Sequence, residues 1–385
     1  MHFNTQVGII GAGPAGLLLA QLLHLHGIDS IVIEAQSRAY VESRVRAGLM
    51  EHDSCQQMRN AGVGARMDRE GLRHEGIILR FAGTSHRIPL TELTGRHVTV
   101  YGQQEVVKDL IQARLATLRP ILFEAQAHTI EQTPVIHFRH NNEHHTITCD
   151  FIAGCDGFHG ISRAAMPPGE VFERIYPFAW LGILAEAPPA SHELIYARHD
   201  RGFALLSMRS PRISRLYLQC RPDENLDRWS DDRIWSELDT RLAEPITRGP
   251  ITQKNLAPLR SFVAEPMRAG RLFLLGDAAH IVPPTGAKGL NLAFADAHIL
   301  AHALDDWYRT GSPTGLDTYS TIALRRVWKA ERFSWWFTSL MHRFPDTGGF
   351  GQKVQEAELD YLVHSEAASR ALAENYVGLS LDFAD

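Results

Sequence analysis

Cysteine is scarce in this 385-residue chain. The four cysteines are Cys55, Cys149, Cys155 and Cys220, and no two of them form a C-x-x-C pair. This number and spacing indicate neither a disulfide framework nor a zinc site. The first six residues also lack the basic segment that opens a secretory signal. We therefore expect a cytoplasmic protein whose cysteines stay reduced.

Long apolar runs and a strong charge of one sign are also absent. No apolar run reaches the roughly 18 residues that a membrane-spanning helix needs, and the apolar stretch over residues 17–25 ends at Gly27. The formal net charge is −5, which gives no electrostatic reason to bind nucleic acid or acidic membranes. We expect neither as a partner. Hydrophobic residues make up 44% of the chain, an ordinary globular composition. The length suggests two or three domains or one large interleaved unit.

Histidine, in contrast, is abundant, with 20 residues. Four of them gather in one stretch: His137, His140, His144 and His145. The segments on either side alternate between polar and apolar residues around Asn141 and Asn142, which predicts a hairpin. No cysteine or carboxylate is spaced to complete a metal site there. We interpret the stretch as a solvated hairpin and expect no metal.

The first 34 residues have the pattern of a β-α-β unit. A buried strand is predicted over residues 6–10, a helix over residues 17–26 that ends at Gly27, and a second buried strand over residues 30–34. Such a unit requires a parallel sheet covered by helices.

The predicted secondary structure changes along the rest of the chain. Alternating runs at residues 203–208 and 214–219 predict antiparallel strands, residues 272–275 return to a buried-strand pattern, and the chain is predicted to be helical from about residue 290, as over residues 317–337. We therefore predict an α/β protein (α+β overall). A discontinuous Rossmann-like β-α-β domain receives an inserted, mostly antiparallel sheet, and a helical C-terminal region follows. The predicted bounds are residues 1–72, 98–175 and 270–290 for the Rossmann-like domain, 73–97 and 176–269 for the inserted domain, and 291–385 for the helical region.

A G-x-G-x-x-G run joins the first strand to the first helix. Gly11 permits the tight turn, Gly13 lets the backbone approach a pyrophosphate, and Gly16 lets helix and strand pack closely. The helix N-terminus adds free N–H groups and a positive dipole. Glu34 ends the second strand, where a carboxylate accepts hydrogen bonds from an adenosine ribose. This pattern predicts a dinucleotide site without distinguishing NAD from FAD.

Two later segments make that distinction. Residues 152–163, around Asp156, resemble the Asp-Gly fingerprint of flavoprotein hydroxylases, and residues 271–280, around Asp277, resemble their Gly-Asp fingerprint. Asp277 follows a buried strand, so its carboxylate can bind a ribityl chain. Residues 283–291 then present backbone groups to a flavin ring before a helix begins. We therefore expect bound FAD.

The whole chain, from residue 7 to about residue 379, resembles the p-hydroxybenzoate hydroxylase family of single-component FAD-dependent aromatic hydroxylases. Besides the fingerprints, the resemblance is carried by residues 44–48, 100–103, 191–196, 201–205 and 374–379. It implies a 4-hydroxybenzoate 3-monooxygenase that uses NADPH or NADH and O2, acts through a flavin hydroperoxide, and forms 3,4-dihydroxybenzoate (protocatechuate). It makes the Rossmann-like domain the FAD-binding domain and the inserted domain the substrate-binding domain. It also implies a homodimer.

The resemblance assigns site residues one by one. The residues implied to contact FAD are Gly11, Gly13, Gly16, Glu34, Arg44, Arg46, Gln103, Asp156, Asp277, Lys288, Gly289, Leu290 and Asn291. The substrate carboxylate is expected to bind Ser207, Arg209 and Tyr217, and the phenol to meet Tyr196 and Tyr376. The implied catalytic and positioning residues are His74 at the far end of a proton relay, Arg215 for flavin position, and Pro284, Thr285 and Asn291 beside the flavin and substrate.

The nicotinamide site departs from the family. Gln36, Tyr40 and Arg44 match expected contacts, but Ala35 stands where the family often has a basic residue after the strand acid. A basic residue there would favour the 2′-phosphate of NADPH. Arg38 lies nearby and is a candidate substitute, so the expectation is NADPH with NADH tolerated.

Two alternative functions remain open. One is a related flavin hydroxylase of another phenolic acid, although a carboxylate receptor opposite Tyr196 favours a para arrangement. The other is a non-catalytic flavin-bound sensor, which would not need the expected Tyr196–Tyr376–His74 proton chain. The Trp335-Trp336 pair also matches the family, and we interpret it as packing or a subunit contact.

Overall fold

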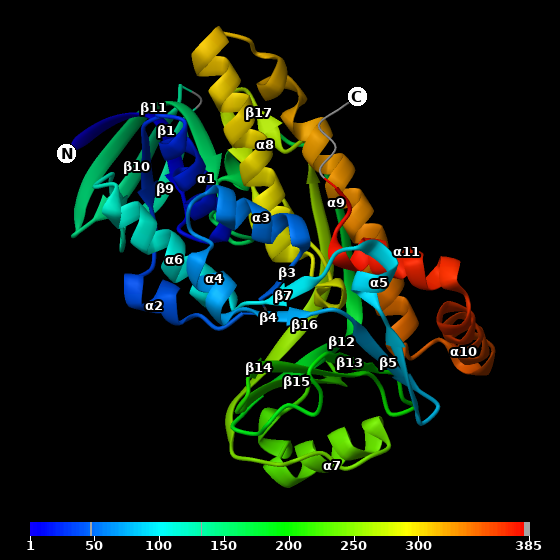
Figure 1. The fold of residues 1–385 in the computed structure, drawn as a ribbon. Helices are drawn as coiled ribbons and strands as arrows, with labels where there is room; N and C mark the ends of the chain where they lie inside the picture. Colours follow the sequence, from blue (N-terminus) through cyan, green and yellow to red (C-terminus); the bar gives the residue numbers. More distant parts are fainter. Residues whose placement is uncertain (47, 132, 381–385) are drawn as a thin grey trace.

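The computed structural model describes residues 1–46, 48–131 and 133–380. Within these residues the strands form three sheets, and the longest helices run beside the two large ones (Figure 1). The predicted class, a Rossmann-like unit with an inserted sheet and a helical C-terminal region, is confirmed. The domain bounds remain a prediction.

The first large sheet holds the β-α-β unit. Its strands are β17 (Arg268–Ala269), β18 (Leu272–Leu274), β11 (Glu143–Gly154), β1 (His2–Ile10), β2 (Ser30–Ile33) and β8 (Ile121–Leu122) in spatial order, with β10 (Val135–His140) and β9 (Gln126–Glu131) attached beside β11. From β18 to β8 every neighbouring pair is parallel. A parallel sheet places the ends of β1, β2 and β18 at one edge, and this edge meets the Gly-rich turn.

The predicted histidine hairpin is formed by β10 and β11, with positive φ at Asn141 and Asn142. One part of the prediction is wrong: His145 is buried rather than solvated, because its ring stacks on Phe138 with centroids 5.2 Å apart. In the described ranges, no cluster of three or more His, Cys, Asp or Glu residues could hold a metal ion.

The second large sheet is mostly antiparallel, as predicted. Its spatial order is β19 (His280–Ile281), β16 (Ile251–Glu265), β12 (Glu170–Ala185), β15 (Ile213–Cys220), β14 (Ala204–Ser210), β13 (Leu194–Ala197), β5 (Ile77–Phe81) and β6 (Thr84–Ile88). Only the β13–β5 pair is parallel among these described strands. Helix α7 (Asp231–Leu242) covers one face of this sheet (Figure 1).

The sequence did not predict the third sheet, which consists of β3 (Leu49–Met50), β7 (Val98–Val100) and β4 (Leu72–His74). Both of its pairs are antiparallel. In Figure 1 these short strands lie between the two large sheets, so His74 is placed at their junction.

Helices complete the molecule. The remaining ones are α1 (Pro14–Leu25), α2 (Arg38–Ser43), α3 (His52–Asn60), α4 (Ala65–Glu70), α5 (Leu90–Thr94), α6 (Gln103–Ala116), α8 (Gly289–Thr310), α9 (Thr314–Met341), α10 (Gly348–His364) and α11 (Glu366–Val377), with 3-10 turns η1 (Arg163–Ala165), η2 (Leu226–Arg228), η3 (Gly276–Ala278) and η4 (Pro284–Gly286). One apolar core lies among α1, α6, α8 and α9, and another joins the second sheet to α9 and α11. None of the helices within these ranges is both long and apolar enough to cross a membrane.

Candidate active site

The Gly-rich turn is packed tightly on one side and open on the other. Gly11 has a φ of +109°, and a Cβ there would lie 2.3 Å from the carbonyl oxygen of Cys155. A Cβ on Gly16 would lie 2.2 Å from the carbonyl oxygen of Gly11. A Cβ on Gly13 would meet nothing within 4 Å. The N-terminus of α1 therefore faces a free space that suits a pyrophosphate.

Glu34 is fastened to this turn through both carboxylate oxygens. Its Oε2 accepts a hydrogen bond of 2.8 Å from the Ala12 backbone N–H, and its Oε1 accepts one of 2.8 Å from the Gln36 N–H. The carboxylate thus has a fixed position beside the turn, where the sequence predicts an adenosine ribose.

The two aspartates of the fingerprints differ in their surroundings. Asp156 Oδ2 accepts hydrogen bonds of 2.9 Å from the N–H and hydroxyl of Ser162, while its Oδ1 is buried and finds no partner among the described residues. Burial raises the pKa of this carboxyl, and the bonds from Ser162 oppose the rise. Asp277, in η3, is exposed.

A buried side chain on α8 holds the η3 turn in place. Asp296, on α8, accepts a hydrogen bond of 2.9 Å from the Gly276 N–H and pairs with His280 at 2.7 Å. An open turn, an unsatisfied carboxylate oxygen and an exposed Asp277 fit a bound FAD.

The segment expected beside the flavin begins with an exposed Pro284. Thr285 Oγ1 accepts a hydrogen bond of 2.8 Å from Thr338 on α9. The Asn291 side chain donates to the carbonyls of Leu49 and Ala287 and accepts from the Glu51 N–H. Protein contacts therefore hold this segment in place.

Other predicted FAD contacts lie around the same region. Gly289 and Leu290 open α8, Gln103 opens α6, and Arg44 and Arg46 lie exposed after α2. The Lys288 side chain is buried against Glu51 and the carbonyls of Asn375 and Tyr376. Its backbone is thus the part of Lys288 that remains for the predicted FAD contact.

The expected substrate residues share one face of the second sheet. Tyr196 on β13 pairs with Leu205 on β14, which in turn pairs with Tyr217 on β15. Ser207 pairs with Arg215 one step further along the same face, because side chains two residues apart point to the same side.

Arg209 is held partly in place by the protein. One nitrogen of its guanidinium, Nη2, donates to the Arg46 carbonyl at 2.9 Å and to Gln104 Oε1 at 2.8 Å. The other guanidinium nitrogens bond to none of the described residues. Burial lowers the pKa of Arg209, with Tyr217 opposing the change. A half-buried guanidinium with free donors is a strong receptor for a carboxylate.

Near Arg209, the Ser207 hydroxyl donates to the Arg215 carbonyl at 3.1 Å, and Arg215 Nε donates to the Tyr217 hydroxyl at 3.2 Å. Arg215 also reaches Asn255 at 3.3 Å. The structure thus brings the expected carboxylate residues and the expected flavin-positioning arginine together.

The two expected phenol residues meet directly. The hydroxyl oxygens of Tyr196 and Tyr376 lie 2.7 Å apart, and both side chains are buried. Burial raises the pKa of both tyrosines. Either hydroxyl can donate, so the pair can pass a proton between β13 and α11.

His74 is not bonded to this pair. It is buried, and neither ring nitrogen has a hydrogen-bond partner in the described part of the chain. Burial lowers its pKa to about 4, while nearby Glu193 opposes the change. Its place in the relay remains a prediction.

The nicotinamide residues lie around α2. Tyr40 is exposed on this helix, Arg44 follows it, and the Gln36 carbonyl accepts from the Glu124 N–H at 3.1 Å. Arg38, the candidate substitute for a basic residue at Ala35, already pairs with Glu42 at 2.7 Å.

Three residues of the site were not found from the sequence: Gln104, Asp296 and Glu51. Gln104 adjoins the predicted Gln103, and Asp296 lies five residues after Asn291 on the same helix, so proximity in sequence was a usable signal for both. Glu51 belongs to no motif.

Comparison with known proteins shows which family the chain belongs to. The family profile described as FAD binding domain matches residues 4–334. A p-hydroxybenzoate hydroxylase of Acinetobacter baylyi is 51% identical, and the alignment covers 99% of this chain and 98% of that protein. The chain belongs to the p-hydroxybenzoate hydroxylase family. The resemblance found in the sequence is thereby confirmed, and membership makes the chain an FAD-dependent monooxygenase.

More distant similarities are found to another aromatic hydroxylase and to a solved monooxygenase structure. A 3-(3-hydroxy-phenyl)propionate/3-hydroxycinnamic acid hydroxylase of a Mycobacterium species is 25% identical over 76% of this chain and 52% of its own length. The crystal structure of p-nitrophenol 4-monooxygenase from Pseudomonas putida matches with a TM-score of 0.85, covering 99% of this chain and all of that one, at 18% identity. At this identity the likeness shows the fold alone.

Proposed function

We propose that this member of the family hydroxylates 4-hydroxybenzoate ortho to its phenol. In balanced form, 4-hydroxybenzoate, O2, NAD(P)H and a proton give 3,4-dihydroxybenzoate, NAD(P)+ and water. The proposal rests on the buried contact between the Tyr196 and Tyr376 hydroxyls on the sheet face that also carries the Arg209 carboxylate receptor.

The sheet supports a para-substituted substrate. Tyr196 and Tyr217 lie on strands separated by β14, and neighbouring strands are about 4.8 Å apart, so the two backbones lie about 10 Å apart. The receptor around Arg209 and Tyr217 and the tyrosine pair thus lie on different strands of one face, which favours a ring whose carboxylate and hydroxyl are at opposite ends. An ortho or meta arrangement would leave one end without its partner.

Each residue then has a definite task. Arg209 binds and orients the carboxylate, with Ser207 and Tyr217 beside it. Tyr196 accepts the phenol proton as it donates its own to Tyr376, and the proposed relay then carries a proton to His74 and solvent. Without this relay, an ordinary phenol pKa of about 10 would leave the ring protonated and weakly nucleophilic. Bound FAD supplies the electron-transfer and oxygen chemistry. The buried tyrosines and the apolar core behind them exclude water.

For the reductant, we propose NADPH with NADH also accepted, and Gln36, Tyr40 and Arg44 as contacts. These three contacts match the family and support NADPH. Ala35 offers no cation for a 2′-phosphate, and Arg38 already pairs with Glu42, so we expect NADH to be accepted as well. Initial rates with each nucleotide test this preference. Equal kcat/KM values for the two would contradict it.

We also propose a cytoplasmic homodimer. Helix α10 carries exposed apolar side chains on one face, since Phe350, Val354 and Tyr361 follow an i, i+4, i+11 spacing and are 85%, 52% and 59% exposed. Such a stripe suits a second copy of the chain. Light scattering should give twice the chain mass for the wild type and a smaller mass for a Phe350→Ser/Tyr361→Ser variant; a monomeric wild type would contradict the proposal.

The test of the activity uses purified protein with FAD, 4-hydroxybenzoate, O2 and either nucleotide. We expect stoichiometric 3,4-dihydroxybenzoate and nucleotide oxidation that substrate stimulates. Product from 3-hydroxybenzoate or a dihydroxybenzoate instead would indicate the related hydroxylase. No substrate-stimulated nucleotide oxidation would favour a flavin-bound sensor.

A further inference from the structure

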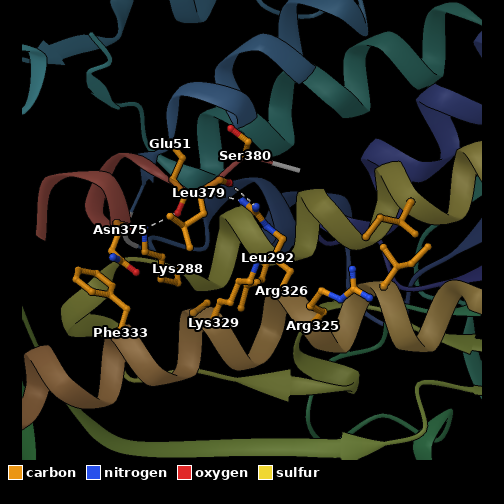
Figure 2. Close-up of a pocket in the computed structure, with 13 residues that line it drawn as sticks. Glu51, Lys288, Leu292, Arg325, Arg326, Lys329, Phe333, Asn375, Leu379 and Ser380 are labelled. Carbon is orange, nitrogen blue, oxygen red and sulfur yellow. Dashed lines mark hydrogen bonds and ion pairs between the residues drawn. The ribbon is translucent and has the colours of Figure 1, made fainter. Parts of the chain in front are cut away.

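Three charged side chains meet in a buried cluster at the C-terminal end of the described chain. Glu51 Oε1 accepts from Lys288 Nζ at 2.5 Å, and Glu51 Oε2 accepts from Arg326 Nη2 at 3.0 Å. The side chains of Lys288, Glu51 and Arg326 are 5%, 2% and 14% exposed. Figure 2 shows Glu51 between the two cations. We call these three residues the Glu51 anchor.

The Glu51 anchor binds the end of α11. The last carbonyls of a helix have no partner within the helix, and cationic side chains satisfy them well. Lys288 donates to the carbonyls of Asn375 and Tyr376, the latter at 3.1 Å. Arg326 Nη1 donates to the carbonyl of Leu379 at 2.7 Å. The backbone on both sides of Val377 and Gly378 is therefore held.

The turn after α11 fits closely against the carboxylate. Gly378 has a φ of +99°, and a Cβ there would lie 2.3 Å from Glu51 Oε2. The Gly378 carbonyl also accepts from Arg96 at 3.3 Å. The Glu51 carboxylate and this turn are therefore in close contact, which couples the position of one to the position of the other.

We propose that Arg326 is a positioning residue for Tyr376. Its guanidinium hydrogen-bonds to both Glu51 and the Leu379 carbonyl, and these two bonds determine the position at which the Tyr376 hydroxyl contacts Tyr196. Arg326 belongs to α9 and hydrogen-bonds to Leu379 and Glu51, so in this proposal it acts on Tyr376 through the anchor. The effect on catalysis rests on the proposed function, since it requires that the tyrosine pair carries the phenol proton.

The geometry of the guanidinium is essential to this role. Arg326 uses Nη1 for one partner and Nη2 for the other, and a planar fork holds both in a fixed relation. A lysine at this position keeps the charge but offers a single ammonium. The two functions of the residue, its charge and its shape, can therefore be separated.

Helix α9 offers a matched control. Arg325 lies next to Arg326 and lines the same groove, as Figure 2 shows, yet it bonds to none of the described residues. Replacing Arg325 removes one positive charge from the groove and leaves the anchor intact.

The experiment compares the FAD-loaded wild type with Arg326→Met, Arg326→Lys and Arg325→Met. The first readout is the pH midpoint at which bound 4-hydroxybenzoate becomes phenolate, followed by its ultraviolet absorbance. We expect both Arg326 variants to raise this midpoint by about one unit, a tenfold change in the ionisation equilibrium. We expect kcat to fall about tenfold, with little change in the KM for 4-hydroxybenzoate, because Arg209 is untouched. Arg325→Met should match the wild type.

A second readout does not need the substrate. Hydrogen–deuterium exchange over residues 366–380 should be faster in both Arg326 variants than in Arg325→Met. Unchanged exchange in Arg326→Met overturns the inference, and so does an unchanged phenolate midpoint. Full recovery in Arg326→Lys overturns it as well, because charge alone would then suffice. A wild type that leaves 4-hydroxybenzoate unchanged contradicts the proposed function instead, and the exchange measurement still tests the anchor.

Discussion

The Tyr196 side chain has two predicted roles, packing through its ring and proton transfer through its hydroxyl, and removing the hydroxyl tests the second alone. Tyr196→Phe keeps the ring contacts with Phe203 and Phe337 and removes the 2.7 Å contact to Tyr376. We expect flavin reduction to persist and 3,4-dihydroxybenzoate yield to fall at least about 100-fold, as for loss of a general base. A single-turnover product assay measures this, with Tyr308→Phe as control, because the Tyr308 hydroxyl bonds to Asp150 outside the site. A normal yield from Tyr196→Phe would remove the tyrosine pair from the mechanism.

Arg209 and Gln104 allow the carboxylate receptor to be tested in two steps. Arg209→Ala removes the charge, and we expect the Kd for 4-hydroxybenzoate to rise about 100-fold, as loss of strong charge-assisted bonds implies. Gln104→Ala only frees the guanidinium from one neutral partner at 2.8 Å. There we expect a rise of about 3- to 10-fold, the worth of one hydrogen bond.

Equilibrium titration of the substrate measures both constants for the carboxylate receptor. Arg212→Ala, an exposed arginine in the turn between β14 and β15, serves as the control. If Arg209→Ala bound 4-hydroxybenzoate as tightly as this control, the carboxylate would have to bind elsewhere.

At the scale of elements, two glycines of the β1–α1 turn have different predicted roles: Gly11 in folding and Gly13 in FAD binding. Gly11→Ala would strain a φ of +109° and strike the Cys155 carbonyl, so we expect lower stability even without FAD. Gly13→Ala has free space in the protein itself, so we expect unchanged apoprotein stability. Its methyl group would occupy the space expected for the pyrophosphate. The FAD Kd should therefore rise about tenfold or more, which corresponds to a loss of about 1.4 kcal/mol in binding free energy.

Thermal unfolding of the apoprotein measures the stability, and fluorescence titration of FAD measures the Kd. Unchanged FAD binding in Gly13→Ala would show that the ligand does not lie on this turn.

Features that depend on neighbouring residues were predictable from the sequence. The turn around Gly11 follows from glycine spacing, and the antiparallel strands that carry Ser207 and Tyr217 follow from the alternation over residues 203–208 and 214–219. The third sheet was missed because β3, β4 and β7 are only two or three residues long and show no period. The burial of His145 was missed because a hairpin pattern does not reveal which face packs on the core.

The Glu51 anchor shows why other parts of the site could not be predicted. Residues 51, 288 and 326 come from three elements far apart in the sequence, and each is an ordinary surface residue type. Only the fold brings their charges together, with the end of α11 held against them. The same holds for His74, whose position between the large sheets depends on the unpredicted third sheet.

At the scale of the whole molecule, α9 contributes to both large apolar cores, and Glu331 on this helix is buried near Ser261 on β16 and His280 on β19 of the second sheet. Its Oε1 has no hydrogen-bond partner among the described residues. Burial raises the pKa of the carboxyl from 4.5 to about 7, while Ser261 and His280 act in the opposite direction. Between pH 4.5 and about 7 the folded protein therefore keeps a proton that the unfolded chain has lost. The free energy of unfolding should fall as the pH rises through this window, because the unfolded chain binds fewer protons.

Glu331→Gln keeps the shape of the protonated carboxyl and removes its titration. From pH 5 to pH 8 we expect the stability of Glu331→Gln relative to wild type to rise by up to about 3 kcal/mol, since each unit of pKa shift corresponds to about 1.4 kcal/mol. Denaturant unfolding of the FAD-loaded proteins at several pH values measures the difference. Glu170→Gln, an exposed glutamate on β12, is the control and should follow the wild type at every pH. A Glu331→Gln curve parallel to wild type would mean that Glu331 is already ionised at pH 5, and that water or a cation reaches this buried carboxylate.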